Sequence, residues 1–114
     1  MIKNNDVFVN GDGETSRDFC YIENAIQANL QASLCDFNPK IHQVFNIALN
    51  TRTSLNELFG LIRDTLKEKL DINISDPEFL DFRVGDVTHS QASIDKAKKF
   101  FNYEPEVNFK VSLE

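Results

Sequence analysis

Short runs rich in β-branched and aromatic residues alternate along this chain with longer segments whose apolar residues recur at helical spacing. The runs predict strands at residues 7–9, 19–22, 44–48 and 78–83, and the longer segments predict helices at 23–34, 55–70 and from Ser90 or Ser93 to Phe101. A chain that alternates in this way packs helices and sheets in layers, so we expect an α/β or α+β fold.

The predicted helix at 55–70 carries the clearest local signals. Thr53 or Ser54 is placed to cap it, and Glu57, three residues after Ser54, completes a capping box. Its apolar residues form one stripe that we expect to lie in the core, namely Leu55, Leu58, Phe59, Ile62 and Leu66. The helix at 23–34 has a similar set at helical spacing, namely Ile22, Ala25, Ile26, Leu30 and Leu34. Asn102 suits the position that ends the last helix.

Charge and composition narrow the classes of protein. The net charge is −6 and the lysines and arginines form no run, which argues against a nucleic-acid-binding surface. No apolar run approaches the roughly 20 residues that span a bilayer, and the first residues lack the apolar core of a signal peptide. We therefore expect a cytoplasmic protein that binds no nucleic acid or membrane. We also expect one domain at 1–114 with no internal boundary.

The two cysteines, Cys20 and Cys35, form no CxxC pair and no metal-ligand cluster with His42 or His89. We expect two reduced, partly buried thiols and no metal site.

The first of three polar stretches is residues 11–19. Its glycines allow close approach of the backbone, and Arg17 can present a guanidinium fork to a phosphate. The alternative is a hairpin loop in which Arg17 contacts Asp18 or Glu14, and for the residues alone this reading is favoured. No GxGxxG or P-loop pattern is present that would hold a dinucleotide pyrophosphate.

The second stretch, Arg83-Val84-Gly85-Asp86, follows a predicted strand. An arginine and a carboxylate around a glycine can hold a phosphate and a ribose diol together. The alternative is a turn with an ion pair inside the loop, which is the commoner arrangement for such residues.

The third stretch is residues 89–92. Ser90 can bond a ligand or cap a helix, and capping is favoured, while an exposed structural role is favoured for His89. No nucleophile, base and orienting acid stand in a recognisable arrangement, so we assign no catalytic residue.

Five motifs in order carry a resemblance that covers nearly the whole chain from about residue 7. They are the segments 11–22, 45–48, 52–58, 81–87 with 89–90, and 103–105. Together they resemble the carboxy-terminal, substrate-binding part of extended short-chain dehydrogenase/reductases of the NAD-dependent epimerase/dehydratase family. More narrowly, they resemble bacterial UDP-N-acetylglucosamine 4-epimerases of polysaccharide biosynthesis.

The resemblance implies roles for particular residues. For Arg17, Arg83 and Asp86 it favours ligand binding over the structural alternatives given above. It implies that Arg17 contacts the phosphates or neighbouring groups, that Arg83 binds the diphosphate and that Asp86 binds the uridine ribose hydroxyls. Residues around Gly11, Gly13 and Ser16 are implied to line the uracil end. Ser90 is implied to lie near the sugar and to influence tolerance for N-acetylated substrates. The implied ligand is UDP-GlcNAc or UDP-GalNAc.

The same resemblance implies what the chain does not supply. The family reaction moves a hydride from C4 of the sugar to NAD and back, and it uses a tyrosine with a lysine four residues later. Here Tyr21 is followed at that spacing by Ala25, and Tyr103 by Val107. We expect the amino-terminal Rossmann domain and the last carboxy-terminal helix to be absent, so that the chain binds no NAD and is inactive alone.

Such a chain is expected to be a truncated reading frame, an isolated fragment or half of a split gene. Two alternatives remain open. One is a non-catalytic binding or assembly module that completes another chain, with self-association through surfaces that the missing domain covers. The other is part of a related nucleotide-sugar dehydratase, decarboxylase or reductase.

Overall fold

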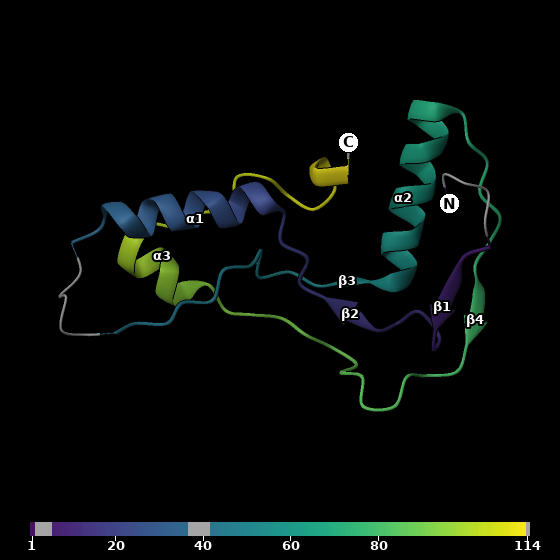
Figure 1. Cartoon of the computed structure of the whole chain (residues 1–114), viewed down its shortest axis with the longest axis horizontal. Coiled ribbons are helices and arrows are strands. Elements are labelled where there is room, and N and C mark those ends of the chain that lie inside the picture. The colour runs from purple at the N-terminus through teal and green to yellow at the C-terminus, as the bar shows by residue number, and fades with distance from the viewer. Residues whose placement is uncertain (2–5, 37–41, 114) are drawn as a thin grey trace. The chain divides into compact units, whose positions relative to one another are not determined.

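A computed structural model describes residues 1, 6–36 and 42–113 of the chain (Figure 1). Along the sequence its elements are β1 (Phe8–Asn10), β2 (Ser16–Arg17), α1 (Ile22–Leu34), β3 (Thr53–Ser54), α2 (Leu55–Leu70), β4 (Glu78–Leu80), α3 (Asp95–Phe101) and the short 3-10 helix η1 (Val111–Leu113). This mixture of helices and short strands confirms the predicted α/β or α+β class. In the part of the chain that is described, no helix is long and apolar enough to cross a membrane.

The chain divides into two compact units, although its sequence predicts no internal boundary. Unit 1 combines the segments 1–17 and 52–90, and unit 2 combines the segments 18–51 and 91–112. Each unit is therefore built from stretches that are distant in sequence. The crossings at 51–52 and 90–91 lie in segments without regular structure, and the one after Arg17 follows β2 directly.

Unit 1 contains two small sheets and α2. β1 pairs in parallel with β4, and β2 pairs antiparallel with β3. The turn after β1 is therefore not the hairpin that its Asn-Gly sequence suggests, because the Gly11 N–H donates to the Leu80 carbonyl at 2.8 Å. α2 starts directly after β3 with the predicted capping box, in which the Ser54 and Glu57 side chains cap each other's backbone N–H groups.

Unit 2 packs α1 and α3 around a small core. Its buried members are Ala28, Ala48, Ile94, Ala97, Phe101 and Tyr103. The fully buried Tyr103 donates its hydroxyl to the Ala48 carbonyl at 3.0 Å. α3 ends at Asn102 in the left-handed conformation, as the sequence predicts. Cys20 and Cys35 are both free and half-buried, which confirms the predicted reduced thiols.

Several predicted strand and helix limits are wrong. The run at 19–22 is not a strand, because the strand ends at Arg17 and Ile22 opens α1. The run at 44–48 pairs with no other strand among the described residues, and β4 ends at Leu80 instead of continuing to residue 83. α3 begins at Asp95, after both serines considered as its start. Strand propensity identifies a segment that can form a strand, but the strand forms only where a second strand is placed to pair with it.

Asp18 links three passages of the chain in unit 2. Its Oδ1 accepts a hydrogen bond from the Leu49 N–H at 3.0 Å, and its Oδ2 accepts one from the Ala92 N–H at 3.3 Å. Both backbone donors lie in segments without regular structure, so they have no ladder or helix to satisfy them.

Asp18→Ala tests this link. Loss of both acceptors leaves two half-buried N–H groups without their partner, and we expect the free energy of unfolding to fall by roughly 2–4 kcal/mol. Urea denaturation followed by circular dichroism measures the loss. Asp36→Ala is the matched control, because Asp36 is exposed in the same unit, and we expect it to change little. Equal losses in the two variants would contradict the role of Asp18.

Tyr103 and Cys20 predict instability at alkaline pH. Burial raises the pKa of the Tyr103 hydroxyl, with Cys20 and Asp18 adding to the effect, and burial also raises the pKa of the Cys20 thiol. Both groups stay protonated when folded, while the unfolded chain releases these protons at lower pH. Their stabilisation is therefore complete below the unfolded pKa values of roughly 8.5 and 10 and declines as pH rises above them.

We accordingly expect the thermal unfolding midpoint to fall between about pH 8.5 and 10.5, and to fall less steeply in Tyr103→Phe. At neutral pH the same variant should lose about 1 kcal/mol with the hydrogen bond to Ala48. A parallel pH dependence in wild type and Tyr103→Phe would show that the tyrosine does not contribute.

Candidate functional site

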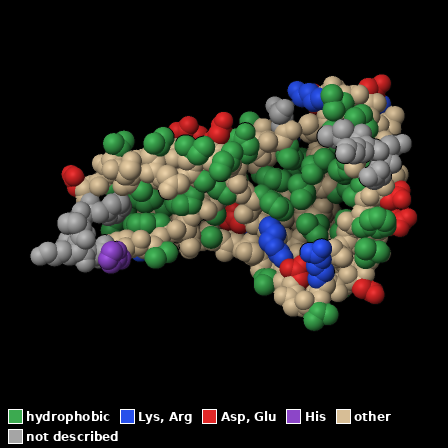
Figure 2. Space-filling model, in the orientation of Figure 1, with side chains coloured by type: hydrophobic (Ala, Val, Ile, Leu, Met, Phe, Trp, Pro, Cys, Tyr) green, Lys and Arg blue, Asp and Glu red, His purple; other side chains and the backbone are tan. Residues whose placement is uncertain are grey.

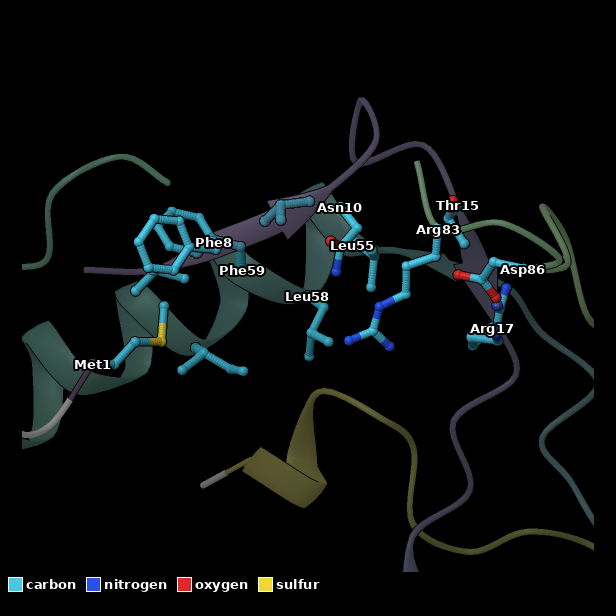
Figure 3. Close-up of a pocket in the computed structure, with 13 residues that line it drawn as sticks. Met1, Phe8, Asn10, Thr15, Arg17, Leu55, Leu58, Phe59, Arg83 and Asp86 are labelled. Carbon is cyan, nitrogen blue, oxygen red and sulfur yellow. Dashed lines mark hydrogen bonds and ion pairs between the residues drawn. The ribbon is translucent and has the colours of Figure 1, made fainter. Parts of the chain in front are cut away.

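Unit 1 has a cavity of about 390 Å³ that Arg17, Arg83 and Asp86 line, and a more open one of about 440 Å³ that Ser16 lines. The first cavity lies within the volume range of roughly 300–1,000 Å³ that is typical of small-molecule sites. Its lining comes from β1, from the strand β2, from one face of α2 and from the loop after β4 (Figure 3): Met1, Val7, Phe8, Val9, Asn10, Thr15, Arg17, Leu55, Leu58, Phe59, Ile62, Arg83 and Asp86. Four segments far apart in sequence thus meet at one cavity.

One part of the cavity is apolar. α2 contributes successive turns of its stripe, and Phe8 stands opposite on β1 (Figure 3). The sequence predicts Leu55, Leu58 and Phe59 only as core residues. Phe59 is buried, but Leu55 and Leu58 are half-buried and line the cavity. Periodicity alone carries no signal that separates these two roles, because it reports only which residues share a face.

The other part of the cavity is charged. Arg17 Nη2 lies 2.6 Å from Asp86 Oδ1, and Arg17 Nη1 donates to the Ser16 carbonyl at 2.9 Å. About a third of the Arg17 side chain and less than half of the Asp86 side chain are exposed, at 30% and 44%. The ion pair therefore remains open to a ligand. It replaces both alternatives considered from sequence, a contact of Arg17 with Asp18 or Glu14 and a pair within the loop 83–86.

Arg83 brings a second guanidinium group to the same part of the cavity (Figure 3). The loop turns sharply here: the Asp86 N–H donates to the Arg83 carbonyl at 3.3 Å, and Gly85 has φ +82°. The Arg83 side chain is exposed and has no ion pair or hydrogen bond with another side chain in the described part of the chain. Two arginines thus face one carboxylate, which leaves a local excess of positive charge in an acidic protein.

The remaining predicted site residues do not line this cavity. A side chain on Gly11 would meet the ring of Phe82, and one on Gly13 would meet the side chain of Asn56. The buried Ser16 hydroxyl is hydrogen-bonded to His89 Nδ1 at 2.8 Å. Neighbouring strand residues point to opposite faces, so Arg17 and Ser16 cannot share one.

Ser90 also lies outside the cavity lining. Its N–H donates to the Ser16 carbonyl at 3.1 Å, and the Ser16 N–H donates to the Thr88 carbonyl at 2.9 Å. These bonds hold the segment 88–90 beside β2. Ser90 does not cap α3, which begins at Asp95.

No family model matches the chain, but comparison with known proteins finds similar sequences and structures. The chain is 31% identical over 114 residues to a putative UDP-glucose 4-epimerase of Methanocaldococcus jannaschii, covering 100% of this chain and 34% of the relative. The structure of UDP-glucose 4-epimerase from Thermotoga maritima with UDP-glucose matches with a TM-score of 0.83 and 34% identity, over 99% of this chain and 34% of that one.

Two further structures extend the comparison. A UDP-N-acetylglucosamine 4-epimerase from Methanobrevibacter ruminantium in complex with UDP-N-acetylmuramic acid has a TM-score of 0.81 and 33% identity, over 98% of this chain and 33% of that one. A UDP-glucuronic acid 4-epimerase variant from Bacillus cereus, solved with a fluorinated UDP-sugar and NAD, has a TM-score of 0.80 and 26% identity, over 99% and 34%.

The homologues of this chain are therefore nucleotide-sugar epimerases of the short-chain dehydrogenase/reductase type. In particular, they are UDP-sugar 4-epimerases of the NAD-dependent epimerase/dehydratase family, which confirms the predicted resemblance. The chain spans about a third of the length of the relatives that it matches. That share is consistent with the predicted carboxy-terminal part.

The environments of two glycines predict different costs of substitution. Gly11 and Gly85 both have a positive φ, but only Gly11 faces a neighbouring ring, while the space beside Gly85 is open. Gly85→Ala should cost only backbone strain, about 1–2 kcal/mol. Gly11→Ala should cost roughly 1–3 kcal/mol more, because Phe82 must move. Urea denaturation of both variants measures the difference, and equal losses would show that Phe82 yields without cost.

Proposed function

We propose that this chain is the UDP-sugar-binding portion of an NAD-dependent UDP-N-acetylglucosamine 4-epimerase, and that its 114 residues do not catalyse epimerisation by themselves. The observation that carries the proposal is the meeting of Arg17, Arg83 and Asp86 at one end of a ligand-sized cavity whose other end is apolar. The proposal assigns residues 1–114 to the carboxy-terminal, nucleotide-sugar-binding part of such an enzyme.

The chemistry of the cavity supports UDP as the ligand. Guanidinium groups bind phosphate oxygens through charge-assisted and often bidentate hydrogen bonds, so Arg17 and Arg83 suit a diphosphate. Asp86 offers carboxylate oxygens to the hydroxyls of a ribose. The apolar side chains of α2 and β1 supply the hydrophobic wall that small-molecule sites commonly have.

The proposal of an N-acetylhexosamine as the sugar is supported by the resemblance of the motifs and not by the cavity. Relatives and similar structures include a putative UDP-glucose 4-epimerase and a UDP-N-acetylglucosamine 4-epimerase. The resemblance of the motifs favours the N-acetylhexosamine, with Ser90 near the sugar and Gly11, Gly13 and Ser16 toward the uracil. These four assignments remain proposals, and the cavity lining supports none of them.

The described residues do not fit NAD. A dinucleotide pyrophosphate needs glycines that leave open backbone at the start of a helix. The space beside Gly11 is taken by Phe82 and that beside Gly13 by Asn56. Of the two open glycines, Gly60 lies inside α2 and Gly85 in a loop after β4, so neither starts a helix. We therefore assign the NAD of the complete enzyme to the part of the relatives that this chain does not match. Tyr103 is also unsuited to be a catalytic base, because it is fully buried and bonded to Ala48.

An NMR titration of the chain with UDP tests the proposal. We expect shifts in residues lining the cavity and a fall in affinity of roughly 10- to 100-fold in Arg83→Ala, because a hydrogen bond to a charged group contributes about 1.5–3 kcal/mol. Lys69→Ala is the matched control: Lys69 is an exposed cation of unit 1, without an ion pair in the described part of the chain and outside the cavity lining.

The control decides how a positive result is interpreted. Equal losses in Arg83→Ala and Lys69→Ala would show that UDP is held only by nonspecific attraction to positive charge. A folded chain whose spectrum does not respond to UDP would overturn the proposal that these residues form a binding site by themselves.

A further inference from the structure

The second cavity of unit 1, of about 440 Å³, shares no lining residue with the first. Side chains at 14–17 alternate between the two: Thr15 and Arg17 line the first cavity, and Glu14 and Ser16 line the second. Successive residues of an extended chain point to opposite faces, so the two cavities lie on opposite faces of this part of the chain. The UDP proposed for the first cavity therefore leaves the second without a ligand.

Charged and polar side chains line the second cavity throughout. Two carboxylates, from Glu14 and Glu57, stand there with the Arg52 guanidinium group and the His89 imidazole, and the other lining side chains are neutral and polar. The Ser16 hydroxyl and His89 Nδ1 bond each other at 2.8 Å, so this pair adds no charge while the imidazole is neutral. Covering charged groups with an apolar ligand is costly, so the ligand of this cavity must itself be charged or polar.

The start of α2 lies at the second cavity but does not offer it an anion site. The N–H groups of Leu55 and Asn56 donate to backbone carbonyls at 3.0 Å, and the Glu57 N–H donates to Ser54 Oγ at 3.2 Å. The Glu57 carboxylate also stands at this helix end. Helix N-termini bind anions through free N–H groups, and here the first three are occupied. The charged side chains must therefore decide which ligand binds.

Opposite charges line the second cavity without neutralising each other. The Arg52 side chain is exposed and makes no ion pair with Glu14, Glu57 or any other residue in the described part of the chain. In the first cavity Arg17 and Asp86 are instead in contact at 2.6 Å, and Figure 2 shows basic and acidic side chains side by side on the face that it presents. The second cavity thus keeps a positive and a negative side apart.

Hydrogen bonds hold both carboxylates in place and leave one oxygen of each available. Glu14 Oε1 accepts a hydrogen bond from Asn56 Nδ2 at 2.8 Å, and Glu57 Oε2 accepts one from the Ser54 N–H at 2.7 Å. The second oxygen of each carboxylate has no hydrogen bond to a residue in the described part of the chain. The negative side of the cavity is therefore fixed by the fold and still open to a donor.

We propose that the second cavity binds a small zwitterion, a molecule of amino-acid size with one ammonium and one carboxylate group. Its carboxylate pairs with the Arg52 guanidinium group, and its ammonium group donates to the available oxygens of Glu14 and Glu57. A ligand with a single charge would leave the opposite charge of the cavity without a partner, whereas a zwitterion satisfies both. The proposal does not rest on the UDP site, because the two cavities share no lining residue.

NMR titrations of the full chain with glycine and with 4-aminobutyrate test the proposal. Each zwitterion is compared with its singly charged counterparts, acetate and methylammonium for glycine, and butyrate and butylammonium for 4-aminobutyrate. We expect at least one zwitterion to shift the resonances of the second cavity and to bind at least about tenfold more tightly than either counterpart, because each counterpart loses one charge-assisted contact. If neither zwitterion binds, or if a counterpart binds equally well, the proposal is wrong.

Arg52→Gln and Glu14→Gln separate the two sides of the cavity. Each should lower the affinity for the zwitterion by roughly tenfold, and a glutamine at position 14 keeps an oxygen that accepts from Asn56. Lys69→Gln and Glu68→Gln are the matched controls, because both are exposed charged residues of α2 outside the two cavities. Equal losses in a variant and its control would overturn the proposal.

Arg83→Ala distinguishes the two cavities. Arg83 lines only the first cavity, so this variant should weaken the binding of UDP and leave the affinity for the zwitterion unchanged. A loss of zwitterion binding as large as that in Arg52→Gln would mean that the zwitterion occupies the first cavity, and the second cavity would then have no such ligand.

Discussion

The two hydrogen bonds accepted by Asp18 hold together the parts of unit 2 that have no regular structure. One carboxylate oxygen fixes Leu49 at the end of the segment 44–48, and the other fixes Ala92 just before α3. Because Ala48 and Ile94 lie in the buried core, these bonds place the chain on both sides of it. The preceding residue, Arg17, belongs to unit 1 and lines the cavity. Asp18 thus stabilises the packing of unit 2, while the adjacent Arg17 lines the cavity of unit 1.

The cavity depends on geometry that joins distant segments. Asp86 is 69 positions from Arg17, and the turn at Gly85 together with the pairing of β1 and β4 brings the loop 83–86 to it. The ion pair is partly exposed, so it contributes little to stability. Its more important consequence is that Asp86 balances only Arg17 while Arg83 at the same cavity stays unpaired among the described residues, which lets an overall acidic chain present a cationic site to a diphosphate.

Unit 2 combines a small buried core with exposed apolar side chains on α1. The core residues around Tyr103 are buried. The segment 44–48 packs against this core through Phe45, Ile47 and Ala48 although it forms no strand ladder among the described residues. The side chains of α1 that are exposed and apolar are Ile22, Ile26, Leu30 and Leu34.

The sequence by itself determined the features that depend on neighbouring residues. The capping box of Ser54 and Glu57, the left-handed Asn102 and the extents of α1 and α2 follow from side chains within one or two turns. The five motifs likewise indicated the family to which the homologues belong.

Only the tertiary structure decided which strands pair, which face of α1 is buried, and that Arg17 pairs with Asp86. It also brought Arg17, Arg83 and Asp86 together while leaving Gly11, Gly13, Ser16 and Ser90 outside the cavity lining. The physical reason is that strand pairing and burial depend on partners distant in sequence, which periodicity and propensity do not identify.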